Sequence, residues 1–224
     1  YTQGTGIVTF DATATITLLS TDNTFDDLTI SAGTVTLASA VVVTNALTIS
    51  GGTLVKGTNA ITSAGSLTMS GGDLTSTSGA VTVTGAVNIS STASAIDFGS
   101  ETWTVSGTWT NASTDGTVWE AGTGTVTFDS ATGGTMTFAG ANLAEAEFSS
   151  VTFNSTGALS QTFTMATRGL SWSGTLTITG DTVLAKATFT LGAEASGALT
   201  VGGAGTNALT STSGAVTVTT VSIA

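Results

Sequence analysis

Leu28-Thr29-Ile30-Ser31 recurs as Leu47-Thr48-Ile49-Ser50 and as Leu67-Thr68-Met69-Ser70, and the three copies begin 19 and then 20 residues apart. In each copy apolar side chains alternate with Thr or Ser, which is typical of a strand with one buried and one solvated face. Glycine follows every copy within three residues and marks a turn. A strand repeated at a nearly constant period indicates stacked coils.

The same alternation runs through most of the chain, so we expect an all-β protein. The period predicts a parallel β-solenoid (β-helix) with about 20 residues per rung. Some spacings, such as the 14 residues between Leu67 and Val81, are short for a three-sided coil. Two β-sandwich domains therefore remain the alternative.

A longer duplication divides the chain. The segment Gly4-Thr5-Gly6-Ile7-Val8-Thr9-Phe10-Asp11 returns 118 residues later as Gly122-Thr123-Gly124-Thr125-Val126-Thr127-Phe128-Asp129. We predict two β-repeat units, residues 1–121 and 122–224, stacked as one continuous body.

Composition excludes most kinds of chemistry. The 224 residues include no His, no Cys and no Pro, and the net charge is −11. Ordinary zinc, haem and iron–sulfur sites, thiol nucleophiles and imidazole bases are therefore absent, and we expect no cofactor and no enzymatic activity. The negative charge disfavours nucleic acid. No apolar run approaches the roughly 18 residues of a membrane helix, so we expect no membrane insertion.

The L-T-I-S and G-T-G-T-V-T-F-D motifs resemble those of low-complexity repeat proteins of bacterial and archaeal surfaces. The resemblance implies a parallel β-solenoid used as an adhesin, sheath or surface filament. It implies no active residue.

Strand edges suggest how such a chain would act. Soluble β-proteins protect exposed edges with Pro or Lys, whereas this chain has no Pro, and both terminal segments alternate as bare strands. We expect a non-enzymatic extracellular subunit that binds itself through these edges, as a filament, sheath or surface layer. A fragment of a longer chain is the simpler explanation of the bare ends, and the alternative function is a segment of a surface adhesin or carbohydrate-binding β-helix, with glycans as partners.

Acidic residues gather near the first coil. Asp22, Asp26 and Asp27 are candidates for a calcium site, since calcium prefers several oxygen ligands, but a solvated loop is the favoured interpretation. Glu145 and Glu147 lie at a similar place in the second unit. Neither group forms a recognisable catalytic pair.

Two further sets of side chains are candidate carbohydrate sites. Asn88, Asn111 and Asn154 each begin an Asn-x-Ser/Thr glycosylation acceptor. Four tryptophans could stack on sugar rings, although core filling is the favoured interpretation; they are Trp103, Trp109, Trp119 and Trp172.

Thr-x-Thr triplets are frequent, for example at Thr102/Thr104, Thr125/Thr127 and Thr175/Thr177. They are similar to the triplets of ice-binding solenoids. Such a surface needs one fixed rung spacing, and the uneven intervals between these triplets favour generic outward-facing Thr instead.

Overall fold

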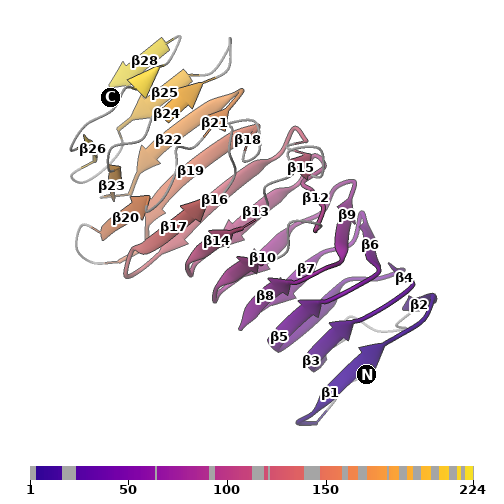
Figure 1. Cartoon of the computed structure of the whole chain (residues 1–224). Helices are drawn as coiled ribbons and strands as arrows, with labels where there is room; N and C mark the ends of the chain where they lie inside the picture. The colour runs from indigo at the N-terminus through magenta and orange to yellow at the C-terminus, as the bar shows by residue number, and fades with distance from the viewer. Residues whose placement is uncertain are drawn as a thin grey trace.

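Parallel strand pairing organises the described part of the chain, which comprises residues 4–16, 24–63, 65–90, 94–112, 119–120, 122–138, 147–157, 161–165, 171–180, 182–186, 191–193, 198–202, 207–211, 216–217 and 220–223. In this computed structural model the backbone forms stacked turns roughly 21 residues apart (Figure 1). Every pairing between described strands is parallel. The predicted β-solenoid is therefore confirmed, and the sandwich alternative is wrong, because sandwich sheets are antiparallel.

The strands lie on three faces, named A, B and C in the order in which the chain visits them. Face A comprises β3 (Thr24–Ile30), β5 (Val41–Ile49), β7 (Ile61–Ser63), β10 (Val81–Val83), β13 (Thr102–Val105), β16 (Thr125–Ser130), β19 (Ser150–Ser155), β22 (Thr175–Thr179), β25 (Ala198–Val201) and β28 (Thr220–Ile223). The first halves of β3 and β5 belong to face A and their second halves to face B, so the two faces form one sheet.

Face B begins with β1 and continues through the second halves of β3 and β5. Its other strands are β8, β11, β14, β17, β20, β23 and β26. Their bounds are β1 (Ile7–Phe10), β8 (Ser66–Met69), β11 (Val87–Ile89), β14 (Trp109–Asn111), β17 (Gly134–Phe138), β20 (Gln161–Met165), β23 (Thr182–Lys186) and β26 (Ala208–Ser211).

Face C consists of two sheets. The first contains β2 (Ala14–Ile16), β4 (Thr34–Leu37), β6 (Thr53–Gly57), β9 (Asp73–Ser76), β12 (Ile96–Asp97) and β15 (Trp119–Glu120). The second contains β18 (Glu147–Phe148), β21 (Ser171–Trp172), β24 (Leu191–Ala193) and β27 (Val216–Thr217).

Face A runs unbroken past residues 121 and 122, because β13 pairs directly with β16. The division into two repeat units at that point stays a prediction.

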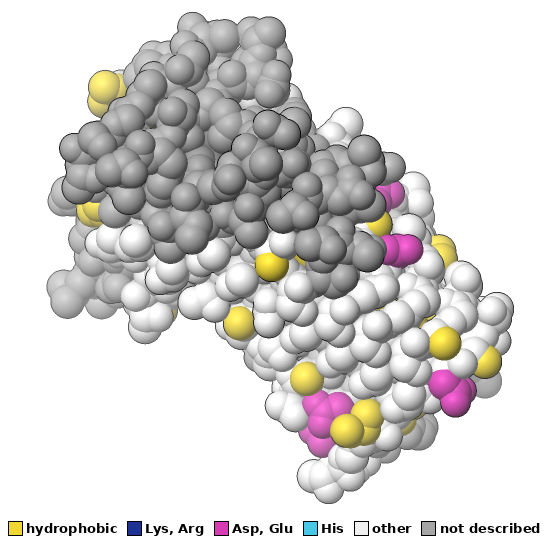
Figure 2. All heavy atoms as spheres, in the orientation of Figure 1, with side chains coloured by type: hydrophobic (Ala, Val, Ile, Leu, Met, Phe, Trp, Pro, Cys, Tyr) yellow, Lys and Arg dark blue, Asp and Glu magenta, His cyan; other side chains and the backbone are white. Residues whose placement is uncertain are grey.

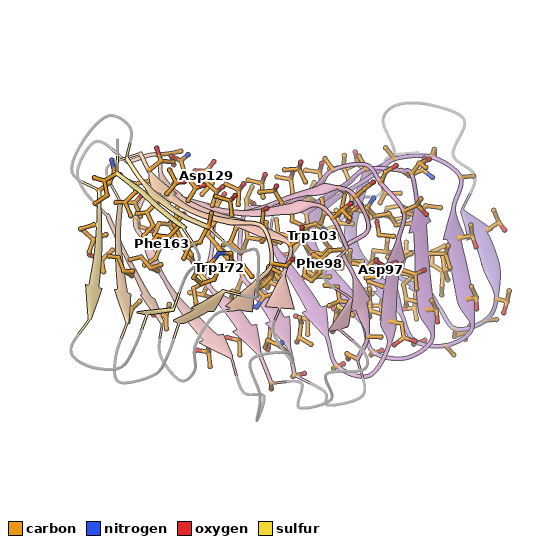
Figure 3. The ribbon with its side chains drawn as sticks, turned by 90° about the horizontal axis from the view of Figure 1, so that it is seen from above. Asp97, Phe98, Trp103, Asp129, Phe163 and Trp172 are labelled. Atoms are coloured by element: carbon orange, nitrogen blue, oxygen red, sulfur yellow. The ribbon has the colours of Figure 1, made fainter. Side chains whose placement is uncertain are left out.

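The core is filled by the inward-facing residue of each alternating pair. The repeated Leu residues stack as the sequence period predicts, since Leu28 pairs with Leu47, and Leu47 pairs with Leu67. All three are buried. Aromatic rings fill the core from Phe98 onward, and the labelled rings in Figure 3 lie between the faces. Packed pairs include Phe98 with Trp103, at a centroid distance of 5.1 Å.

Glycine forms a column at the corner between faces A and B. Gly65, Gly85 and Gly107 occupy equivalent corners of successive turns, where a Cβ atom would overlap a carbonyl oxygen of the turn below. For Gly85 that oxygen belongs to Gly65, and for Gly107 it belongs to Gly85. The turns can stack this closely only because these positions carry no side chain.

We predict that Gly85→Ala lowers the free energy of unfolding by about 1–3 kcal/mol, the usual cost of overpacking. The added methyl group must displace backbone rather than a flexible side chain. Urea unfolding followed by circular dichroism measures the loss. Gly4→Ala is the control, because nothing lies within 4 Å of a Cβ built there, and an equal loss in both variants would contradict the explanation.

Candidate functional site

A lysine occupies a core position in β6. Burial alternates along this strand, so Lys56 faces inward with Leu54, and its exposed fraction is 0%. The pairing with β9 shifts between Val55 and Gly57, which leaves Lys56 as the extra residue of a bulge. Gly57 follows with a φ of 58°, the left-handed conformation that glycine adopts readily. Strand alternation thus places the lysine inside the solenoid, and the bulge and Gly57 lie at the position where it enters the core.

Glu101, two turns further along the chain, neutralises this lysine. The Lys56 Nζ atom lies 2.5 Å from Glu101 Oε2, and both side chains are 0% exposed. Nζ also donates to the carbonyl oxygens of Ser78 and Gly79, at 2.5 and 3.0 Å. The three donors of the ammonium group therefore have three acceptors.

The carboxylate of Glu101 has further donors. Trp103 Nε1 donates to Oε1 at 2.6 Å, and the Ser76 hydroxyl donates to Oε2. Lys56, Ser76 and Glu101 come from three successive turns, so this cluster, which we call the Lys56–Glu101 cluster, connects them through side chains. No substrate can reach it without opening the core, since both charged groups are fully buried. The arrangement suits a structural connection between turns.

Burial raises the pKa of the Glu101 carboxyl above its usual value of 4.5. The hydrogen bond and charge of Lys56 and the hydrogen bonds from Ser76 and Trp103 act in the opposite direction. A raised pKa in the folded state means that the folded protein holds the proton more tightly than the unfolded chain does. The contribution of this carboxyl group to the free energy of unfolding is therefore complete below pH 4.5. It decreases as pH rises through the pKa that the group has in the folded state.

Lys56→Met is expected to lower the free energy of unfolding by about 3–5 kcal/mol at neutral pH, because it leaves a buried carboxylate without its cation. Removing Lys56 also removes two influences that lower the Glu101 pKa. The stability deficit relative to wild type should therefore shrink as pH falls toward 4.5. Urea midpoints between neutral and mildly acidic pH measure it, and a deficit independent of pH would contradict this account.

The double variant K56M/E101Q is the matched control. It removes both charges and keeps an amide oxygen that can accept from Trp103, so its stability should lie close to wild type across the same pH range. A double variant as unstable as K56M alone would show that the loss in K56M does not come from the unpaired carboxylate of Glu101.

Sequence reasoning missed this cluster, although its signal is present in the strand pattern. Lys56 has the same parity as Leu54 in β6, and Glu101, which directly precedes β13 two turns later, has the same parity as Trp103. Two charged residues of opposite sign at inward-facing parities, one inside a strand and one directly before a strand, form the pattern that could have predicted the pair.

The described acidic candidates near the first coil accept hydrogen bonds from the backbone and from a neighbouring side chain. Asp26 accepts from the Gly6 N–H at 3.0 Å, and Asp27 accepts from the Asn45 amide at 2.8 Å and from the Ala46 N–H at 3.0 Å. Among the described residues no three His, Cys, Asp or Glu side chains form a group that could hold a metal. Asp22 and Glu145 lie outside the described residues, as does the side chain of Glu147.

The tryptophans do not form a sugar-binding platform. Trp103, Trp109 and Trp172 are each 0% exposed, so none of these indole rings can stack on a sugar. The stacking hypothesis is wrong for these three residues because their rings fill the core, as Figure 3 shows for Trp103 and Trp172. Trp172 also donates from Nε1 to the Ala198 carbonyl at 2.8 Å. The side chain of Trp119 lies outside the described residues.

The three glycosylation candidates differ in exposure. Asn88 is exposed on face B, in the middle of β11, and Asn154 is half-buried in β19. Asn111 is 1% exposed, so its prediction as an acceptor is wrong for the folded protein. Its inward position in β14 explains why. Glycosylation of Asn88 and Asn154 stays a prediction.

The chain was compared with protein-family models, with curated proteins and with solved structures, and none of the three comparisons finds a match. Within the ranges that the structure describes, no helix has the length and hydropathy needed to span a membrane. The class defined by the geometry is thus the parallel β-solenoid, with a buried ion pair in its core.

Proposed function

We propose that this β-solenoid is a non-enzymatic structural subunit of an extracellular filament, sheath or surface layer, and that copies stack end to end by parallel strand addition. A strand edge with unpaired N–H and C=O groups is a template for another chain. Strand addition supplies affinity through the main chain and needs no catalytic group.

The observation that carries the proposal is the apolar character of both ends of the core. Buried hydrophobic residues fill the middle, whereas the inward-facing Val8, Phe10, Val201 and Leu209 at the terminal turns are only partly buried. Ile7 and Ile223, beside them, are 67% and 83% exposed. Covering these residues would remove apolar surface from water.

The order of the faces supports one arrangement of neighbours. The chain visits faces A, B and C in turn, β28 lies on face A, and β1 lies on face B. β26 is the last described strand of face B and pairs with β23. In the proposed stack, β1 of one copy pairs with the outer edge of β26 in the next, and the solenoid continues without a change of direction. A further stretch of a longer chain could provide the same contact.

The outer surface supports an extracellular structural role. Where the residues of the visible face are coloured by type in Figure 2, most side chains are uncharged, and Asp and Glu occur at a few places. The whole chain has 8% charged residues and no cysteine. A chain with few charged side chains and no thiol group is not altered by the redox state of its surroundings, which suits a surface polymer.

Thr9→Pro is designed to block stacking without unfolding the subunit. The carbonyls of Gly6 and Phe10 accept from N–H groups of the β3 turn, so by alternation the backbone of Thr9 faces the free edge of β1. Proline there removes a donor from that edge alone. We expect wild type to form filaments or sheets in negative-stain electron microscopy as concentration rises, and T9P to remain as dispersed short rods.

Thr9→Val is the matched control, since it keeps the backbone donor and should assemble like wild type. Circular dichroism and thermal unfolding establish that both variants are folded. Wild-type protein that stays monomeric at high concentration would overturn the proposed function, and so would a T9P variant that assembles as well as T9V.

A further inference from the structure

The outward-facing hydroxyls of face A form a regular array despite their uneven spacing in the sequence. Strand register aligns one Thr from each of seven successive turns into a column: Thr62, Thr82, Thr104, Thr127, Thr152, Thr177 and Thr200. A second column lies two residues earlier on the same strands and contains Thr102, Thr125, Ser150 and Thr175. We call these two columns the Thr array.

The array corrects the expectation that uneven intervals prevent a ladder. Thr104 pairs with Thr127, and Thr127 pairs with Thr152, although 23 and then 25 residues separate them in the sequence. Extra residues are placed in the connections between strands, so the register on face A is unchanged. The fixed spacing that ice binding requires is therefore present in space.

The dimensions of the array follow from sheet geometry. Neighbouring strands lie about 4.8 Å apart, and alternate residues along a strand lie about 6.6 Å apart. Hexagonal ice repeats its oxygen positions at distances of this order. Because Thr is branched at Cβ, few rotamers are available and its hydroxyl and methyl groups are held in a repeated orientation.

The hydroxyls of the first column are available to an external partner. Within the described part of the chain, the side chains of Thr104, Thr127, Thr152 and Thr177 make no hydrogen bond to protein, and each is half-buried between its neighbours in the column. Their oxygen atoms are therefore not engaged by a protein donor or acceptor.

The absence of charged side chains in the Thr array restricts the kind of partner that could bind there. Neither column contains a charged residue, and Asp129 lies at the margin of the array, two residues beyond Thr127 (Figure 3). A charged polymer or a mineral surface would find no counter-charge in the columns. An uncharged, flat and periodic surface that bonds through hydroxyl groups is the matching partner.

Face B provides an internal comparison. Its outward column also contains Thr, including Thr48 and Thr68, but the neighbouring outward column passes through Asp27, Ala46 and Ser66. Around Thr48 and Thr68, face B thus has a single column of threonines, whereas face A has two columns from β13 to β22.

We propose that face A binds crystalline ice through the Thr array. The hydroxyls occupy positions of lattice water, and the methyl groups order the water between them. This interaction does not depend on end-to-end stacking, since the array runs along the side of the solenoid and β1 and β26 lie at its ends.

The test is thermal hysteresis of the full chain, with growth inhibition seen as faceted ice crystals in a nanolitre osmometer. Wild type should show hysteresis, and T127Y/T152Y should lose it, because the two bulky rings prevent flat contact with the crystal. T48Y/T68Y, the equivalent pair on face B, should retain it. Circular dichroism and sedimentation establish that all three proteins are folded and have the same association state.

Absence of hysteresis in folded wild-type protein would overturn the inference, and so would equal loss in the two double variants. Side-by-side pairing of wild-type chains that T127Y/T152Y abolishes, without hysteresis, would assign face A to a second copy instead. Measuring T9P in parallel separates this inference from the proposed function, because T9P removes stacking and should leave hysteresis intact.

Discussion

The in-register hydrogen-bond ladder between successive turns is the constraint on which the rest of this structure depends. A parallel ladder places each residue directly over its partner one turn away, so the alternation of inward and outward side chains is copied from turn to turn. A slip of one residue would move every apolar side chain of a strand to solvent. The apolar core, the glycine column at the corner and the Thr array on face A are all consequences of this one register.

The Lys56–Glu101 cluster is a local exception to the apolar core, and its geometry fits the same constraint. Two opposite charges can be buried only when they meet and their remaining donors and acceptors are satisfied. Here the partners come from different turns, and Ser76, Trp103 and two carbonyls complete the set. A shift of one turn relative to another would leave both charges unpaired in the core. The cluster therefore opposes register slippage, a use of buried polar groups that is documented in other folds.

Local pattern was sufficient to predict the strands, the parallel solenoid and the stacking of Leu28, Leu47 and Leu67, because period-2 alternation and a constant repeat determine them directly. It could not assign strands to faces. Val8 and Val126 belong to the same duplicated octapeptide, yet β1 lies on face B and β16 lies on face A. One inward-outward pattern fits any face of the coil. The candidate sites were harder to predict: parity would have placed Asn111 and three tryptophans inside, but pairing Lys56 with Glu101 requires the register across two turns.

The regularity of a solenoid surface belongs to its ladder rather than to its sequence intervals. Between Thr104 and Thr152 the chain varies the length of its connections, yet hydrogen bonding keeps these threonines in one column. Insertions are tolerated in surface loops because closing a longer loop costs little additional free energy, whereas a change inside a strand would disrupt pairing on both sides. A solenoid can therefore diverge in length from turn to turn and still present a periodic face. For this class of protein, a surface that recognises a periodic partner is found by aligning strands in space, and a search for equal spacing in the sequence overlooks it.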